Sequence, residues 1–177
     1  FDRAAYVNDD AQIDKVADGK ASQAIAEQAT TLLRNQGNIL PIAKTVKSIV
    51  VIGKPATEFA VGGGSGEVTP FANNSILDGI KARAGSSVTV TYDDGTKAPR
   101  AAAAAKAADI AIVVAKDTYG EGADRACLSL NCPSIGGDQD GLIEAVAASQ
   151  PKTVVVLESG GADLTPWRSK VAALVSA

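Results

Sequence analysis

The stretch KSIVVIG, residues 47–53, decides the fold class. Four consecutive β-branched residues end at a glycine, which is typical of a strand buried on both faces of a sheet. Further runs of the same kind are expected as strands, and they are SSVTVTYDDG (86–95), DIAIVVAK (109–116), KTVVVLESGG (152–161) and AALVSA (172–177).

Helical patterns lie between these runs. They are NNSILDGIKARAG (73–85), APRAAAAAKAAD (98–109), GDQDGLIEAVAAS (137–149) and the shorter TPWRSKVA (165–172). Pro99 suits the first turn of its helix, and Gly85 is a stop signal. Strands that alternate with helices in this way predict an α/β fold, with a mostly parallel sheet and helices on both faces.

The N-terminal part of the chain lacks this alternation of strand and helix patterns. Residues 1–20 are polar and acidic and are expected to form a linker into the domain at 21–177. A helix is predicted from Ser22 onward and is expected to end at Gly37 and Pro41. Its apolar face would consist of Ile25, Ala29, Leu32 and Leu33.

Composition limits the classes of function. The chain has 177 residues and a net charge of −3, and it contains no basic stripe, so nucleic-acid binding is not expected. Its apolar runs are too short to span a bilayer. The first residues do not form a signal peptide, and the chain has no Met, so we interpret it as a mature or excised piece of a longer protein.

The chain also lacks histidine, so it cannot by itself form a Ser-His-Asp triad, a Cys-His pair or a His-based metal site. Neither a metal nor a cofactor is expected. Cys127 and Cys132 are five residues apart in a loop segment. They either form a small disulfide, which the loop setting and a secreted character favour, or remain buried thiols.

Three loops, at 54–72, 116–137 and 158–165, follow strands and are rich in Gly, Ser and acidic residues. If the strands are parallel, these loops share one edge of the sheet, where ligands of such folds bind. The glycine-rich segment VGGGSGEV lacks the lysine of a phosphate-binding loop and does not fit a dinucleotide fingerprint. It is either a surface loop or a segment whose backbone amides bind an anion or sugar hydroxyls.

The loop YGEGADRACLSLNC, residues 119–132, places Glu121 between two glycines. A carboxylate there is either a solvated loop charge or a proton donor held over a cleft, whose pKa burial against a substrate would raise. Arg125 is expected to pair with Asp124 and fix the loop. Trp167, in ESGGADLTPW, is expected to pack in the core.

Taken together, several segments resemble glycoside hydrolase family 3, the β-glucosidase type, in the order of that family. They are AIAEQATTLLRNQGNILPI, IVVIG, GGGSGEVTP, ILDGIKARAG, AAAAAKAADIAIVV, GEGADRACLSL, QDGLIEAVAASQPKTVVVLESGG and PW. The resemblance implies the α/β sandwich domain of a secreted enzyme, with its C-terminal part missing. A barrel domain bearing an Asp nucleophile would be its partner.

The resemblance also implies roles for individual residues. Glu121 would be the acid/base of a retaining hydrolase that releases terminal sugars from β-glycosides. Gly64 and Ser65 would contact the carbohydrate substrate, and Asp124 and Arg125 would support the loop. The segment CLSLNCPSIGGDQD is longer than the common family form.

Alternative functions remain open. Within the family these are a β-xylosidase, an arabinofuranosidase or an N-acetylhexosaminidase. Outside catalysis, the chain would be a carbohydrate-binding or scaffold domain. A flavodoxin-like nucleotide domain is disfavoured by the missing phosphate-loop lysine.

Overall fold

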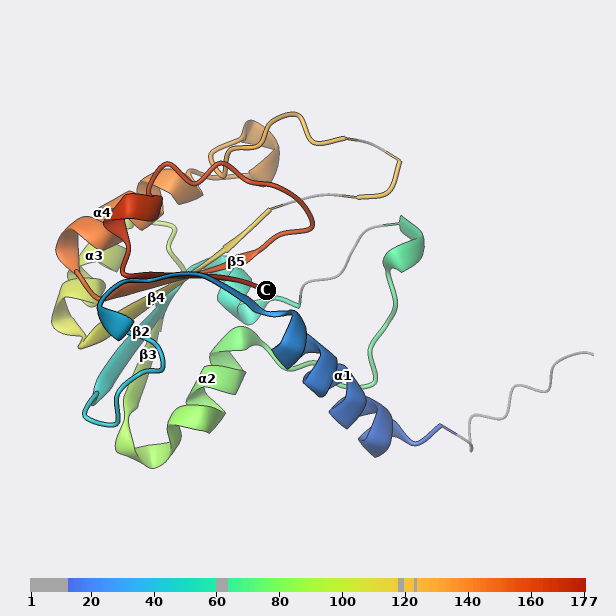
Figure 1. Ribbon diagram of the computed structural model, residues 1–177. Helices are drawn as coiled ribbons and strands as arrows, with labels where there is room; N and C mark the ends of the chain where they lie inside the picture. The colour runs from blue at the N-terminus through green and yellow to red at the C-terminus, as the bar shows by residue number, and fades with distance from the viewer. Residues whose placement is uncertain (1–12, 60–63, 118–119, 123) are drawn as a thin grey trace, which may run out of the picture. The chain divides into compact units, whose positions relative to one another are not determined.

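The computed structural model describes residues 13–59, 64–117, 120–122 and 124–177 (Figure 1). The chain divides into two compact units, Phe1–Thr30 and Thr31–Ala177. The described part of the first unit holds helix α1 (Lys15–Ala29), and the second unit holds all of the sheet.

The sheet has six strands in the order β1-β6-β5-β4-β2-β3. Strands β2 to β6 are parallel to one another, and only β1 is antiparallel to its neighbour, β6. The strands are β1 (Thr31–Asn35), β2 (Ser48–Ile52), β3 (Thr89–Asp93), β4 (Ile110–Lys116), β5 (Thr153–Glu158) and β6 (Ala173–Ser176). The predicted α/β fold with a mostly parallel sheet is therefore confirmed.

Helices cover both faces of this sheet (Figure 1). Helices α3 (Ala98–Ala107) and α4 (Gln139–Ser149) pack on one face, and α2 (Ile76–Ala84) packs on the other. Alternate residues of the central strands point to opposite faces, so Val113 joins the α3 and α4 side while Ile112 joins the α2 side. This two-sided burial explains why the strands read as continuous apolar runs.

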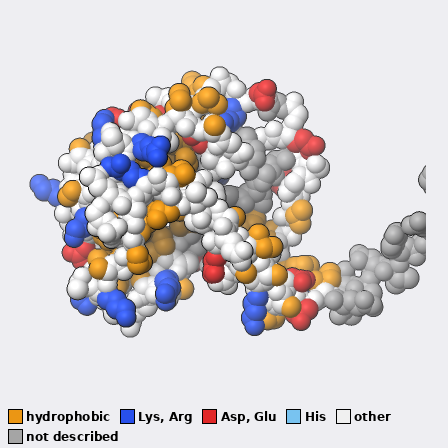
Figure 2. Space-filling view, viewed as in Figure 1, with side chains coloured by type: hydrophobic (Ala, Val, Ile, Leu, Met, Phe, Trp, Pro, Cys, Tyr) orange, Lys and Arg blue, Asp and Glu red, His pale blue; other side chains and the backbone are white. Residues whose placement is uncertain are grey.

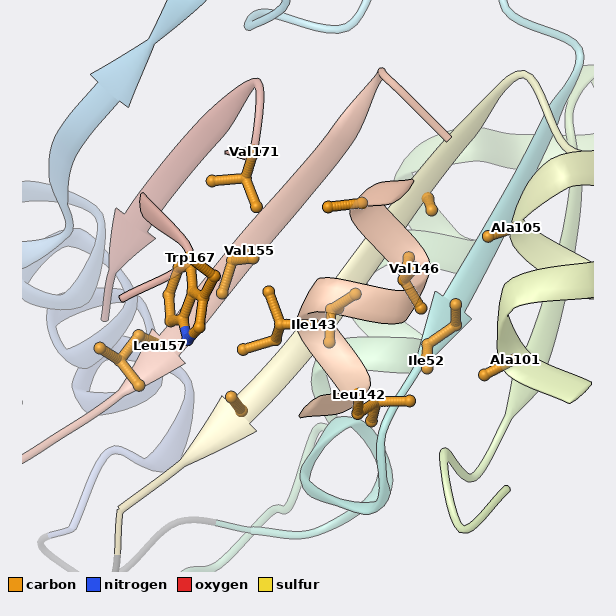
Figure 3. Close-up of a cluster of buried hydrophobic side chains, with 14 of the residues drawn as sticks. Ile52, Ala101, Ala105, Leu142, Ile143, Val146, Val155, Leu157, Trp167 and Val171 are labelled. Atoms are coloured by element: carbon orange, nitrogen blue, oxygen red, sulfur yellow. The ribbon is translucent and has the colours of Figure 1, made fainter. Parts of the chain in front are cut away.

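Trp167 is fully buried in the core beside α4, as expected (Figure 3). Its indole Nε1 donates a hydrogen bond of 2.7 Å to Oδ1 of Asp140, a buried residue in the first turn of α4. A buried indole N–H needs such a partner, because leaving it without one would cost free energy. The short 3-10 helix Arg168–Lys170 follows and leads into β6.

Local sequence explains where the helices begin and end. The Ser75 hydroxyl accepts a hydrogen bond from the amide of Asp78 at the start of α2, and Gly85 ends that helix with a positive φ of 64°. The Asp138 carboxylate likewise accepts from the amide of Gly141 in α4. The caps at Ser75 and Asp138 set the points at which α2 and α4 begin.

The prediction of one helix from Ser22 to Gly37 is wrong. Helix α1 begins at Lys15, ends at Ala29, and is followed directly by β1. The apolar spacing that suggested a longer helix includes Leu32, which instead pairs with Val175 across the β1–β6 edge. Backbone pairing with a distant strand, which spacing along the sequence cannot reveal, overrides the helical pattern here.

The interdomain linker expected at residues 1–20 stays a prediction. Residues 1–12 lie outside the described residues, and residues 15–20 belong to helix α1.

Figure 2 shows Lys and Arg side chains spread over the sheet-bearing unit and interspersed with apolar and acidic side chains. Among the described residues, no helix combines the length and the hydropathy that a membrane span requires.

Candidate functional site

The three Gly- and Ser-rich loops follow β2, β4 and β5, which are adjacent and parallel. Their described residues therefore leave the sheet at one edge, as predicted. Residues 60–63, 118, 119 and 123, which belong to two of these loops, lie outside the described residues.

Glu121 and Ser65 meet at this edge. The backbone amide and the hydroxyl of Ser65 both donate to Oε2 of Glu121, each over 2.7 Å. Ser65 lies in the loop after β2, within the short 3-10 helix Gly64–Gly66, and Glu121 lies in the loop after β4. The structure thus brings together two residues that the sequence analysis assigned to one site.

Gly64 allows this close approach. A Cβ atom at Gly64 would lie 2.5 Å from Cβ of Glu121 and 2.6 Å from its Oε2, and the residue has a φ of +74°. A residue larger than glycine would therefore clash with Glu121 unless one of the two loops moved, and it would also be strained by the positive φ.

The two hydrogen bonds from Ser65 lower the pKa of Glu121, the amide bond having the larger effect. The side chain is exposed, and its desolvation opposes this effect only weakly. In this chain Glu121 is therefore a stabilised carboxylate. A raised pKa, as a general acid requires, would need further burial against a substrate or another protein surface.

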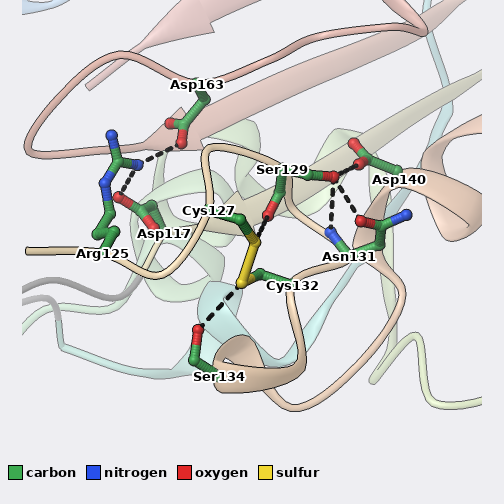
Figure 4. The surroundings of a disulfide bond; sticks show 9 residues. All are labelled: Asp117, Arg125, Cys127, Ser129, Asn131, Cys132, Ser134, Asp140 and Asp163. Atoms are coloured by element: carbon green, nitrogen blue, oxygen red, sulfur yellow. Dashed lines mark hydrogen bonds and ion pairs between the residues drawn. A yellow bond between two sulfur atoms is a disulfide. The ribbon is translucent and has the colours of Figure 1, made fainter.

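Arg125 does not form the expected pair with Asp124. Its Nη1 donates to carboxylate oxygens of Asp117 and of Asp163, the latter over 2.7 Å (Figure 4). Its Nη2 donates to the carbonyl of Ala162 over 2.5 Å. Asp124 is exposed. Arg125 therefore joins its loop to two other segments, through partners that are distant in the sequence.

Cys127 and Cys132 form a disulfide with an S–S distance of 2.01 Å, which confirms the favoured reading (Figure 4). Next to it, the Ser129 hydroxyl donates to Oδ2 of Asp140 over 2.8 Å. Because Asp140 also accepts from Trp167, the disulfide-bearing loop is connected to the core.

Glu158, at the end of β5, is an acidic residue that the sequence analysis did not single out. Burial raises the pKa of its carboxyl, while the nearby Lys116 cation opposes this shift. Its Oε2 is buried and has no hydrogen-bond partner among the described residues. Lys116 itself pairs with Glu58 over 2.7 Å. The only sequence signal was an acid that directly follows an apolar run.

A separate cavity of about 550 Å³ is lined by residues at the ends of β2 and β4 and at the start of α4. Its lining includes Gly53, Gly95, Lys116 and Gln139, but neither Glu121 nor Ser65. The Glu121 and Ser65 pair is therefore an exposed site and not part of the lining of this cavity.

The Glu121 site contains few groups that could take part in a reaction. It offers one carboxylate, adjacent hydroxyl and amide donors, and a loop joined to other segments through Arg125. Over the ranges that the structure covers, no group of three or more Cys, Asp or Glu side chains is placed to hold a metal ion. The arrangement is suited to donating or accepting one proton, or to binding hydroxyl groups.

Comparisons with known proteins agree on one family. The family model described as "Glycosyl hydrolase family 3 C-terminal domain" matches residues 30–177. The thermostable β-glucosidase B of Acetivibrio thermocellus is 33% identical over 96% of this chain, which covers 23% of that protein. A β-xylosidase of Formosa agariphila is 33% identical over 77% of this chain, and the match covers 21% of that protein.

Solved structures show the same similarity. The β-glucosidase DesR of Streptomyces venezuelae, solved with D-glucose, matches 92% of this chain with a TM-score of 0.85 and 26% identity, and 35% of its own chain is covered. A Bifidobacterium adolescentis family 3 β-glucosidase matches 94% of this chain with a TM-score of 0.79 and 30% identity, and the match covers 25% of its own chain. This chain spans about a quarter of the length of the curated relatives described above.

Proposed function

The chain belongs to glycosyl hydrolase family 3, as its C-terminal domain, and from this membership we propose that it is the acid/base-bearing part of a retaining β-glycosidase. The observation that carries the proposal is the placement of Glu121. Its carboxylate lies on a glycine-flanked loop at the carboxyl edge of a parallel sheet, in contact with Ser65 of the neighbouring glycine-rich loop.

Retaining hydrolysis needs two carboxyl groups about 5–5.5 Å apart. One attacks the anomeric carbon, while the other protonates the leaving oxygen and afterwards takes a proton from water. We assign the second role to Glu121. The nucleophile would come from a barrel domain, because this chain spans only part of its relatives and the Glu121 site offers a single carboxylate.

The proposed substrate is a carbohydrate with a terminal β-glycoside, β-glucose being the first choice. Relatives named as β-glucosidases support that choice. A β-xylosidase is the second candidate, because one relative of similar identity carries that name. We further propose a secreted protein, since disulfides persist in oxidising compartments.

The test is Glu121→Gln in the complete enzyme. Loss of a general acid should lower kcat on a substrate with a poor leaving group, such as an alkyl glucoside, by about 10²–10⁴-fold. A dinitrophenyl glucoside, which needs no protonation to leave, should be cleaved at the glycosylation step with far less loss.

Glu67→Gln is the matched control. Glu67 is an exposed acid two residues after Ser65, so its replacement changes the charge of the same edge without touching Glu121. Unchanged turnover of the alkyl glucoside by Glu121→Gln, or an equal loss in Glu67→Gln, would exclude the assigned role. A parallel panel of aryl glucosides and xylosides decides between the two candidate substrates.

A further inference from the structure

The Glu121 loop is held by a buried charge cluster that consists of Asp117, Arg125 and Asp163 (Figure 4). The side chains of both aspartates are only 2% exposed and that of Arg125 is 16% exposed. Two carboxylates share one guanidinium, so this largely desolvated cluster has a formal charge of −1. Burying ions in this way is costly and is weak evidence for a gain in stability.

The cluster joins three segments of the chain. Asp117 directly follows β4, Arg125 lies four residues after Glu121, and Asp163 lies in the loop after β5. A second connection lies close by, where Ser129 pairs with Leu164 in a parallel bridge and the Leu164 amide donates to the Leu128 carbonyl over 2.9 Å. The segment that follows Glu121 is thus attached to the loop after β5 at two points.

The guanidinium fits closely between these partners. A Cβ atom at Gly161 would lie 3.2 Å from Nη2 of Arg125, closer than an ordinary contact. Oδ2 of Asp163 is buried and has no hydrogen-bond partner among the described residues, so Arg125 supplies the ionic contact of that carboxylate. A lysine could not replace it, because one ammonium cannot reproduce the planar fork toward two carboxylates and a carbonyl.

We propose that Asp117, Arg125 and Asp163 are positioning residues that fix Glu121 for proton transfer to the leaving group. The inference rests on the function proposed for Glu121. The cluster is anchored in the loops after two central strands, and Glu121 is four residues away on the same loop, so its geometry sets where the carboxyl group stands. General acid catalysis is sensitive to such placement, and a displacement of about 1 Å can cost 10²-fold in rate.

The test compares Arg125→Lys, Asp163→Asn and Glu121→Gln in the complete enzyme, each on an alkyl glucoside and on a dinitrophenyl glucoside. We expect the first two variants to lower kcat/KM on the alkyl glucoside by at least about 10-fold. On the dinitrophenyl glucoside kcat/KM, which reports the glycosylation step, should change less than about 3-fold, because that leaving group departs without protonation. On this substrate kcat and KM should fall together, because hydrolysis of the glycosyl-enzyme still needs Glu121 as a base.

Arg100→Lys is the matched control. Arg100 also bridges two aspartates, Asp93 and Asp94, but it lies on α3 and outside the Glu121 loop. Its replacement should give no loss that depends on the leaving group. A merely structural role of Arg125 would reduce kcat/KM of both substrates equally, and that result would overturn the proposal.

Gly161→Ala covers the case in which Arg125→Lys fails to fold. Its methyl group would shift the guanidinium by a few tenths of an ångström, and we expect a loss of about 2- to 5-fold confined to the alkyl glucoside. If Glu121→Gln shows a leaving-group-dependent loss and the cluster variants do not, the positioning role is wrong. If Glu121→Gln shows none, the proposed function itself is wrong.

Discussion

The hydroxyl of Ser65 donates a hydrogen bond of 2.7 Å to the carboxylate of Glu121, although 56 residues separate the two in the chain. The contact connects the loop after β2 with the loop after β4, whose parent strands are neighbours in the sheet. Together with the hydrogen bond from the Ser65 amide to the same oxygen, it lowers the pKa of Glu121 and so favours the charged carboxylate.

Ser65→Ala should raise the pKa of Glu121 part of the way toward its ordinary value. The substitution removes the hydroxyl donor but keeps the amide donor, which has the larger effect. The pKa can be followed by NMR titration of ¹³C-labelled glutamate carboxyls in the complete protein. In activity assays, the basic limb of the pH profile of kcat/KM should move to higher pH, since the acid must be protonated to act. A lower pKa in the variant would contradict the assignment.

Gly64→Ala should separate the two loops. The new methyl group would overlap Glu121, and the positive φ would cost about 1–2 kcal/mol for a residue with a Cβ. We expect a loss of kcat on an alkyl glucoside of at least about 10-fold. Gly66→Ala is the control, because a Cβ there meets nothing within 4 Å. Equal activities of the two variants would show that the close approach is not needed.

Trp167→Phe should destabilise the protein by about 1–3 kcal/mol, because Oδ1 of the buried Asp140 would lose its donor. Asp140 would still accept from Ser129, so the disulfide-bearing loop should remain attached through that bond. Urea unfolding followed by circular dichroism measures the change. An unchanged midpoint and slope would mean that the indole N–H contributes nothing to stability.

Glu158→Gln should stabilise the protein at neutral pH and have little effect below pH 4. The pKa of Glu158 is raised in the folded state, so the folded protein binds this proton more tightly than the unfolded chain. Its contribution to stability is therefore present at low pH and is lost as pH rises through the folded pKa. The gain at pH 7 should stay below about 1 kcal/mol, because the partly exposed group is screened by solvent.

Thermal unfolding of the complete protein at pH 4 and pH 7 tests this expectation, with the exposed Glu67→Gln as control. Equal shifts of the apparent Tm at both pH values would exclude a proton-linked effect of Glu158.

The sequence predicts five of the six strands because burial on both faces produces continuous apolar runs, such as residues 49–52 in β2. Strand β1 was not predicted, and the reason is physical. Leu32 and Leu33 are 53% and 44% exposed, so burial leaves no pattern there, and the strand is defined by its hydrogen bonds to β6.

For the site, the position of each loop after a strand was sufficient to place Ser65 and Glu121 on one edge. The partners of Arg125 were not predictable in the same way. Asp124 is adjacent in the chain, whereas Asp117 and Asp163 reach Arg125 only through the packing of loops from two different strands. Glu158 was missed because a strand-terminal acid does not by itself indicate how deeply its carboxyl is buried.

The pairing of β1 with β6 bears on how the chain folds during synthesis. Thr31 pairs with Ser176, so this edge of the sheet cannot close until the chain has been synthesised past Ser176. Strands β2 and β4 are much closer in sequence and can associate earlier. Until β6 emerges, the β1 segment with its two leucines is an unpaired strand, which makes it the natural target for a chaperone or for misassembly with another nascent chain.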